Sequence, residues 1–235
     1  MESVKQGSCC LGICAKDFAV VAALKRATNE LSSHQKKIFE IDSHIACAIS
    51  GLTADAHALI SYMRTECLEH KFQYDSAVKT SRLVTEVADK HQVKTQQSWT
   101  RPYGVGLLVI GSDADGAHLY QTCPSGNYYE YKAVAIGSRS QSAKSYLEKH
   151  LAEFREGSLD DIVMHALKAL QGPANDKNLD GLNTSVAIVG KDKSFTRLTG
   201  EDLQPYLSRL TVANEDDMEE DGNEDDDDDD DENDE

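Results

Sequence analysis

Cysteine and histidine are the residue types in this chain with the clearest potential for metal or redox chemistry. The cysteines form no CxxC pair, and neither they nor the eight histidines follow the spacing of a zinc or catalytic site. The six cysteines lie in apolar, strand-like segments: Cys9, Cys10, Cys14, Cys47, Cys67 and Cys123. We therefore expect no metal ion and no cofactor, and buried, reduced thiols typical of a cytosolic or nuclear protein.

Acidic side chains gather at the carboxyl end of the chain. Residues 215–235 hold 17 acidic residues and no basic one, with seven consecutive aspartates from Asp225 to Asp231. The other 24 acidic residues equal the 24 Lys and Arg in number, so the rest of the chain is neutral. We predict a folded domain over residues 1–212 and a disordered acidic tail over residues 213–235.

This distribution of charge and apolar residues argues against two classes of partner. A neutral body lacks the basic face that nucleic-acid binding requires. No segment is apolar over the length of a membrane helix, and none has the pattern of a secretory signal. The acidic tail is either a solubilising appendage or a docking segment for basic partners.

The periods of the apolar residues predict an ordered series of elements. Continuous apolar runs and turn residues predict these strands: 20–23, 45–49, 104–111, 117–123, 128–132, 133–136, 184–189 and 195–198. Spacings of three and four predict helices over these ranges: 56–67, from 76 past 88, 143–154, 158–173 and 201–210. Ser76 is the expected N-cap of the second helix, and Ser158 with Asp161 resembles a capping box.

Two antiparallel sheets stacked face to face, each covered by a helical pair, would bury all of these apolar surfaces. The expected fold class is therefore α+β, in the form of a four-layer αββα sandwich. Ser8, Cys10, Gly12 and Cys14 alternate along the chain and would share one face of the first strand.

A series of motifs follows one another along the chain: Gln6-Gly7-Ser8 and the ranges 36–42, 49–56, 101–108, 124–128 and 135–143. In order and spacing they resemble the motifs of proteasome α-type subunits, and the resemblance covers residues 2 to about 210. The resemblance implies the Ntn-hydrolase fold and a structural place in the outer ring of the 20S core. Implied partners are other α subunits in a heteroheptameric ring, β subunits of the inner ring, and regulatory ATPases or activators. Implied roles are ring assembly, substrate entry and regulator docking in ubiquitin-dependent degradation, in the cytoplasm and nucleus.

The resemblance also implies a site in which some β-type relatives cleave peptide bonds. There an amino-terminal threonine attacks the carbonyl, its own amine acts as the base, and a lysine, acids and serines assist. In this chain Ser8 follows Gly7 at the position of the nucleophile. Lys37 matches the assisting lysine, and Ser138 matches one of the serines.

Three leucines argue against catalysis at that site. Leu24 and Leu179 fall where acids stand, and Leu182 falls where a serine stands. Leucine cannot accept a proton or orient an amine. We therefore expect no enzyme, and we keep an autoprocessed hydrolase with Ser8 as the nucleophile as an alternative.

The same resemblance implies a docking role for Lys37. In α-type subunits this lysine lines a pocket between neighbouring subunits and pairs with the terminal carboxylate of a regulator. Gly51 and Leu52 match positions whose backbone borders that pocket. The alternative for Lys37 is an ordinary solvated lysine.

The chain departs from the family pattern in two places. His57 stands where the family usually has arginine, which puts a contact at the ring interface in doubt. The resemblance implies further residues before Met1, with a gate-forming tail and most of a helix, so we expect an amino-terminal truncation. The truncation is a truncated gene model, an alternative start or a diverged paralogue. The acidic tail leaves an unincorporated acidic chaperone or binding paralogue as a second alternative function.

Overall fold

The computed structural model describes residues 2–26, 31, 33, 35–174, 179–191 and 193–210. Its strands pair antiparallel into two five-stranded sheets. Sheet A has the order β10-β9-β2-β1-β8, with bounds Lys193–Leu198, Thr184–Gly190, Phe18–Leu24, Cys10–Cys14 and Ala133–Ile136. Sheet B has the order β3-β4-β5-β6-β7, with bounds Ile38–Asp42, Ile45–Gly51, Val105–Asp113, Gly116–Thr122 and Tyr128–Glu130.

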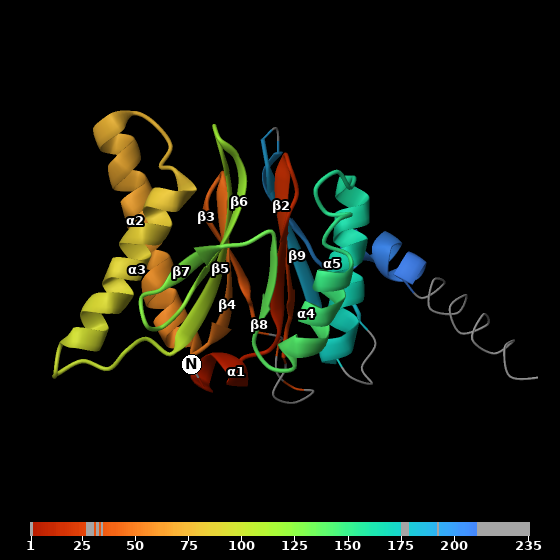
Figure 1. Cartoon of the computed structure of the whole chain (residues 1–235), viewed down its shortest axis with the longest axis horizontal. Helices are drawn as coiled ribbons and strands as arrows, with labels where there is room; N and C mark the ends of the chain where they lie inside the picture. The colour runs from red at the N-terminus through yellow and green to blue at the C-terminus, as the bar shows by residue number, and fades with distance from the viewer. Residues whose placement is uncertain are drawn as a thin grey trace, which may run out of the picture.

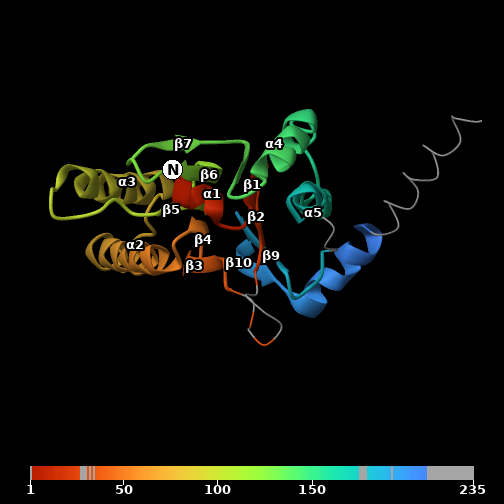
Figure 2. The same ribbon diagram turned by 90° about the horizontal axis from the view of Figure 1, so that it is seen from below.

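Helices cover the outer face of each sheet. The helices are α1 Glu2–Gln6, α2 Thr53–Tyr74, α3 Thr80–Gln96, α4 Ser140–Lys149 and α5 Leu159–Ala174. The pair α2 and α3 packs on sheet B, and the pair α4 and α5 packs on sheet A (Figure 1). The view from below shows the same four layers end on (Figure 2). The predicted αββα sandwich is therefore confirmed.

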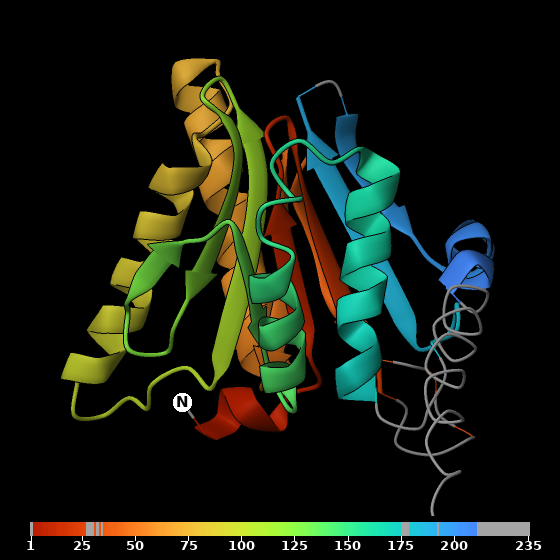
Figure 3. The ribbon, with the colours of Figure 1, turned by 45° about the vertical axis from the view of Figure 1, so that its right-hand side comes forward.

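The short helix α1 lies beneath the two sheets, next to the ends of the central strands (Figure 3). It packs against β4 and β5, and its Val4 is buried. A 3₁₀ turn, Gly200–Leu203, and helical residues 204–210 follow the last strand, as the sequence predicts.

Apolar residues fill three spaces between these layers. On β1, Leu11 and Ile13 face the helices of sheet A, whereas Cys10 and Cys14 face the space between the sheets. Gly12 shares the inner face, because a Cβ there would collide with the Leu119 side chain of sheet B. A strand buried on both faces needs apolar residues at successive positions, which explains the continuous apolar runs of the sequence.

Several predicted helix ends are wrong. The helix predicted over 56–67 runs from Thr53 to Tyr74. Ser76 is not a helix cap: α3 begins at Thr80, and the Ser76 carbonyl instead accepts a hydrogen bond from the His70 ring. Asp75, in the left-handed conformation at φ 51°, ends α2 immediately before it. Ser76 therefore lies in the connection between α2 and α3 and does not begin α3.

The helix predicted over 143–154 ends earlier, at Lys149. Residues 151–156 form turns, in which Leu151 is 42 % exposed although Phe154 is buried. The turn brings Phe154 to the core without continuing the helix. The helical spacing of apolar residues therefore extends beyond the last helical residue, Lys149. The next helix, α5, runs through Pro173 to Ala174, one residue past the predicted stop.

The capping box at Ser158 is confirmed. Ser158 Oγ donates to Asp161 Oδ2 at 2.6 Å, and the Asp161 amide donates to Ser158 Oγ at 3.3 Å. The Ser158 amide also donates to that carboxylate, at 3.2 Å. These bonds satisfy amide groups that the first turn of α5 would otherwise leave free.

All six cysteines are free thiols, and only Cys14 is not fully buried. Burial raises the pKa of the Cys14 thiol to about 11, so this thiol is protonated at neutral pH. Among the described residues, no helix is long and apolar enough to cross a membrane. The predicted acidic tail, 213–235, lies outside the described residues.

Candidate functional site

Ser8 lies between the end of α1 and the start of β1. It is 6 % exposed, and its Oγ donates to the carbonyl oxygen of Leu24 at 2.7 Å. The Ser8 carbonyl oxygen accepts a hydrogen bond from Ser50 Oγ at 3.3 Å. Within the described part of the chain, no carboxylate or imidazole forms a hydrogen bond with Ser8, so no general base is in contact with this hydroxyl.

Close backbone packing holds this corner of the molecule together. A Cβ at Gly7 would collide with the Gly51 amide nitrogen and with Ser50 Oγ, so only glycine fits there. Gly137, at φ +102°, lies against the backbone of Gly7 and Ser8. The Ser138 amide that follows it donates to the Gly7 carbonyl at 2.7 Å.

Lys37 directly precedes β3 and is only 3 % exposed. The alternative of an ordinary solvated lysine is therefore wrong. Its Nζ donates to the Ser8 carbonyl oxygen at 3.4 Å. Among the described residues, no carboxylate lies within ion-pair distance of this ammonium group. A buried ammonium group with one long hydrogen bond is poorly solvated and would interact favourably with an anion.

The three leucines have different environments. Leu24 lies in the core on β2, and its backbone carbonyl accepts the hydrogen bond from Ser8 Oγ. Leu179 is half-buried against the same core, whereas Leu182 is 67 % exposed. None of these side chains carries a group that could accept a proton.

Ser138 is near the site through its backbone rather than its hydroxyl. Its Oγ accepts a hydrogen bond from Arg26 Nη2 at 2.9 Å. Arg26 also donates to the Gln6 carbonyl oxygen at 3.4 Å. The structure therefore brings Ser8, Lys37 and Ser138 to one corner, but it connects the serine hydroxyls to other groups.

Gly51 and Leu52 form the junction between β4 and α2. Gly51 adopts φ +123°, and a Cβ there would collide with the Gly104 carbonyl oxygen. The Leu52 amide donates to that carbonyl at 2.9 Å, while the Leu52 side chain is 49 % exposed. The Lys37 carbonyl accepts from the Ile49 amide at 3.0 Å, so Lys37 lies beside the strand that leads to this junction.

An ion pair at the head of α2 was not predicted from the sequence. Arg101 donates to both carboxylate oxygens of Asp55 at 2.6 and 2.7 Å, and the Gly104 amide donates to Asp55 at 2.8 Å. The hydrogen bonds from Arg101 lower the pKa of the Asp55 carboxyl. The partners are separated by 46 positions, and the only signal in the sequence was an acidic residue in the first turn of a helix.

His57, which follows on the same helix, is exposed. Its ring contacts the Phe39 ring edge-on, with the centroids 5.2 Å apart. It is therefore available on the surface for contact with a neighbouring molecule.

Two stacked antiparallel sheets between helical pairs, with Ser8 before β1 and the ammonium group of Lys37, from the residue before β3, bonded to its carbonyl, define a protein of the Ntn-hydrolase fold. The chain belongs to the proteasome subunit family, whose model, described as "Proteasome subunit", matches residues 4–189.

Curated relatives support the same assignment. The chain is 54 % identical over 212 residues to proteasome subunit alpha type-1 of Dictyostelium discoideum, covering 89 % of this chain and 86 % of the relative. It is 46 % identical over 221 residues to proteasome subunit alpha type-1 of Drosophila melanogaster, covering 92 % and 78 %. The corresponding subunit of Caenorhabditis elegans is 42 % identical over 214 residues, covering 90 % and 82 %.

Proposed function

We propose that this chain is a non-catalytic α-type subunit of the outer ring of a 20S proteasome core. Its neighbours would be other α subunits in a heteroheptameric ring and β subunits of the inner ring. The observation that carries the proposal is the similarity to α-type subunits over about nine-tenths of the chain. The two stacked antiparallel sheets between helical pairs agree with it.

The hydrogen bonding of Ser8 supports the non-catalytic role. An Ntn nucleophile needs a free amine at its own residue to act as the base. Here the Ser8 nitrogen is a peptide nitrogen following Gly7, and the hydroxyl donates to a main-chain carbonyl. Leu24, Leu179 and Leu182 supply neither the acids nor the serine that would orient such an amine.

Exposed apolar side chains support assembly into a larger particle. Leu68 and Phe72 lie one turn apart on α2, and they are 70 % and 95 % exposed. Large apolar residues that share an exposed helical face are typical of an interaction surface. We propose that this face of α2 contacts another subunit of the particle.

Co-sedimentation tests the proposed assembly. The full chain, carrying a small epitope tag, is expressed in cells and their lysate is separated on a glycerol gradient. We expect the tagged chain to sediment in the peptidase fractions of the 20S core. A chain that runs near its own mass of 25.8 kDa would support the unincorporated chaperone instead.

We further propose that Lys37, Gly51 and Leu52 border a docking pocket for the terminal carboxylate of a regulatory ATPase or activator. The buried ammonium group of Lys37 supports this role, because an incoming carboxylate would supply the anion that the described residues do not. The exposed Leu52 side chain would contact the apolar part of the incoming segment.

We propose the cytoplasm and the nucleus as the location of the protein. Six free thiols, five of them buried, suit a reducing compartment. Immunofluorescence of the tagged full chain tests this, and retention in a secretory organelle would contradict it.

A further inference from the structure

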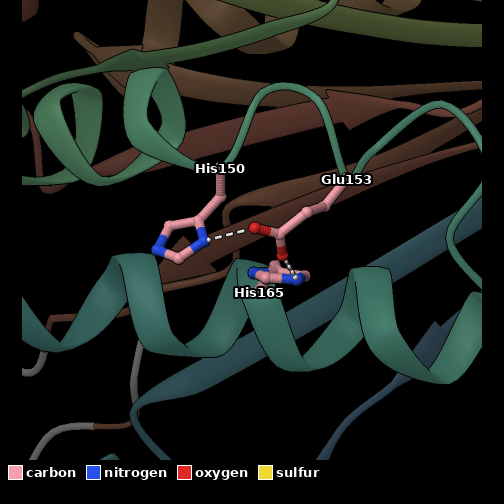
Figure 4. A group of neighbouring side chains, drawn as sticks. All are labelled: His150, Glu153 and His165. Carbon is pink, nitrogen blue, oxygen red and sulfur yellow. Dashed lines mark hydrogen bonds and ion pairs between the residues drawn. The ribbon is translucent and has the colours of Figure 1, made fainter.

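Two histidines and a glutamate converge on the outer side of the α4–α5 pair (Figure 4). His150 lies at the end of α4, Glu153 in the following turn and His165 in α5. His150 Nδ1 lies 3.0 Å from Glu153 Oε1, and His165 Nε2 lies 3.1 Å from Glu153 Oε2. Each side chain presents one ligand atom, and these atoms lie within 4.8 Å of one another.

Packing holds both imidazoles in place. The Tyr146 ring lies against the His150 ring, with the centroids 4.4 Å apart. The His165 ring contacts the buried Phe154 ring edge-on, with the centroids 5.4 Å apart. The side chains of His150 and His165 are 34 % and 17 % exposed and that of Glu153 is 55 % exposed, so the partly buried imidazoles are reachable from solvent on the side of the glutamate.

A hydroxyl group occupies the far side of the His165 ring. Tyr146 Oη lies 3.0 Å from His165 Nδ1. An ion bound at Nε2 leaves the proton on Nδ1, which can then donate to this oxygen. Metal-binding histidines usually have such a partner on the second ring nitrogen, which fixes the ring orientation and the protonation of the ligand.

The dimensions of the cluster suit a small divalent ion. Zinc bonds to nitrogen and oxygen of about 2.0–2.1 Å place tetrahedral ligands about 3.3–3.4 Å apart. The distances of 3.0 Å from His150 to Glu153 Oε1 and 3.1 Å from His165 to Glu153 Oε2 are close to this separation, and the three ligand atoms lie within 4.8 Å of one another. Small side-chain rotations that admit the ion would replace the two hydrogen bonds to Glu153 with metal bonds.

An open hollow of about 390 Å³ adjoins Glu153 and His165. It leaves room for a water molecule as a fourth ligand, which three-ligand zinc sites retain. Asp161 and Lys168 line the same hollow with opposite charges, so they leave no net charge there to oppose the ion.

We propose that His150, Glu153 and His165 form a zinc-binding site that fastens the end of α4 to α5. Two imidazoles with one carboxylate are a ligand set for zinc and other first-row transition ions, whereas calcium and magnesium prefer all-oxygen sites. The spacing of two residues between the first pair and eleven before the last histidine matches no familiar zinc motif, which is why the sequence did not predict it.

Cobalt titration tests the site, because four-coordinate Co²⁺ with nitrogen ligands absorbs visible light far more strongly than oxygen-ligated octahedral Co²⁺. The full chain is used without a polyhistidine tag, in excess Mg²⁺ so that the carboxylates of residues 215–235 are occupied by a hard ion. We expect strong absorption that saturates at one equivalent of Co²⁺ and disappears when Zn²⁺ is added.

Variants assign the ligands. His150→Gln and His165→Gln should each abolish the strong absorption, and Tyr146→Phe should weaken metal affinity by about 10–100-fold. The matched control is His118→Gln, because His118 also contacts carboxylates, those of Glu130 and Asp113, but offers a given ion only one nitrogen and lies outside this cluster. This control should bind Co²⁺ as the unaltered chain does.

The melting curve of each metal-free variant, followed by circular dichroism, shows whether it is folded. If His165→Gln does not fold, the more exposed His150→Gln decides the question. Only weak, octahedral-type absorption by the unaltered chain, or equal strong absorption in folded His150→Gln, would overturn the proposal. Both outcomes are independent of whether the chain enters a proteasome particle.

Discussion

At the scale of single residues, Ser8 and Lys37 lie together but do not form a working pair. Lys37 Nζ contacts the Ser8 carbonyl, whereas Ser8 Oγ contacts the Leu24 carbonyl. Neither contact removes a proton from the hydroxyl, because a main-chain carbonyl is not a general base. Lys37 is only 3 % exposed, so this lysine is not part of the solvated surface.

The docking role of Lys37 predicts a specific loss in assembled particles. Lys37→Ala should weaken stimulation of peptidase activity by a regulator that carries a terminal carboxylate. A charge-assisted hydrogen bond contributes about 1.5–3 kcal/mol, so docking affinity should fall by about tenfold or more. The measurement is stimulated peptidase activity against regulator concentration.

The matched control for this experiment is Lys36→Ala, because Lys36 is the exposed neighbour whose Nζ lies over the Phe39 ring. Particles with either variant should keep the unstimulated activity. Equal regulator affinity for the Lys37→Ala and unaltered particles would show that Lys37 takes no part in docking.

The ionisation of Asp55 predicts that the stability of the folded protein depends on pH. Its pKa in the folded protein is below the ordinary value of 3.8, because Arg101 donates two hydrogen bonds to the carboxylate. The stabilisation is therefore fully present above pH 3.8 and is lost as pH falls through the lowered pKa. Asp55→Asn should lower the free energy of unfolding by about 1–2 kcal/mol at neutral pH, since the Arg101 side chain is partly solvated.

The difference between Asp55→Asn and the unaltered chain should shrink in acid, as measured by urea unfolding at several pH values. Asp89→Asn, at an exposed position on α3, serves as the control and should change stability little at any pH. A difference for Asp55→Asn that stays constant down to pH 2 would show that the ion pair is not its cause.

At the scale of helices and strands, the sequence predicted the strands well and the helix ends poorly. Strands β2 and β4 could be predicted from their continuous apolar runs, which occur because both faces of each strand are buried. The end of α4 could not be predicted from the apolar spacing, because the turn after His150 places Phe154 in the core as a further helical turn would. Helix ends depend on contacts between distant segments, which a local period of apolar residues does not contain.

The same limit applies to the candidate site. Motif order located Ser8, Lys37 and Gly51, but no spacing indicated that Lys37 would be buried beneath Ser8. The pair of Asp55 and Arg101 was missed for the same reason, since its members lie on different elements. The sequence gives the type and order of the residues, whereas the packing of the two sheets determines which side chains are in contact.

The capping box of α5 predicts a helix-specific loss of stability. Ser158→Ala removes the hydroxyl that accepts from the Asp161 amide and should cost about 0.5–2 kcal/mol. For a domain of this size each 1 kcal/mol lowers Tm by about 2–4 °C. Thermal unfolding followed by circular dichroism measures the shift.

Ser145→Ala is the control, because Ser145 lies on the exposed face of α4 and its hydroxyl donates only to the carbonyl one turn earlier. Its Tm should stay near that of the unaltered chain. An equal Tm for Ser158→Ala and Ser145→Ala would contradict the capping role.

The exposed face of α2 predicts an effect on assembly that leaves folding intact. Phe72→Asp places a charge where we propose a subunit contact, and loss of a central aromatic contact costs about 2 kcal/mol or more. Incorporation into 20S particles should fall by about tenfold or more. Because Phe72 is 95 % exposed, the Tm of the isolated chain should change little.

Gln73→Asp adds the same charge at the neighbouring exposed position and is the matched control. The yield of tagged chain in purified particles measures both variants. Equal yields for Phe72→Asp and Gln73→Asp would place the subunit contact on another face.

At the scale of the whole molecule, the four layers leave distinct surfaces for distinct contacts. The α2–α3 pair presents exposed apolar residues, the corner at Ser8 holds a buried cation, and the α4–α5 pair carries the histidine cluster. Of these, the exposed apolar residues of α2 suit contact with another chain, and within the described residues no carboxylate or imidazole bonds to the Ser8 hydroxyl.

The α-subunit assignment can be tested by native mass spectrometry of purified 20S particles, followed by intact-mass analysis of the released subunits. We expect this chain in the particle, with residues 1–7 preceding Ser8 in its mature form. A chain found only outside the particle, or one that begins at Ser8, would contradict a non-catalytic subunit of the α ring.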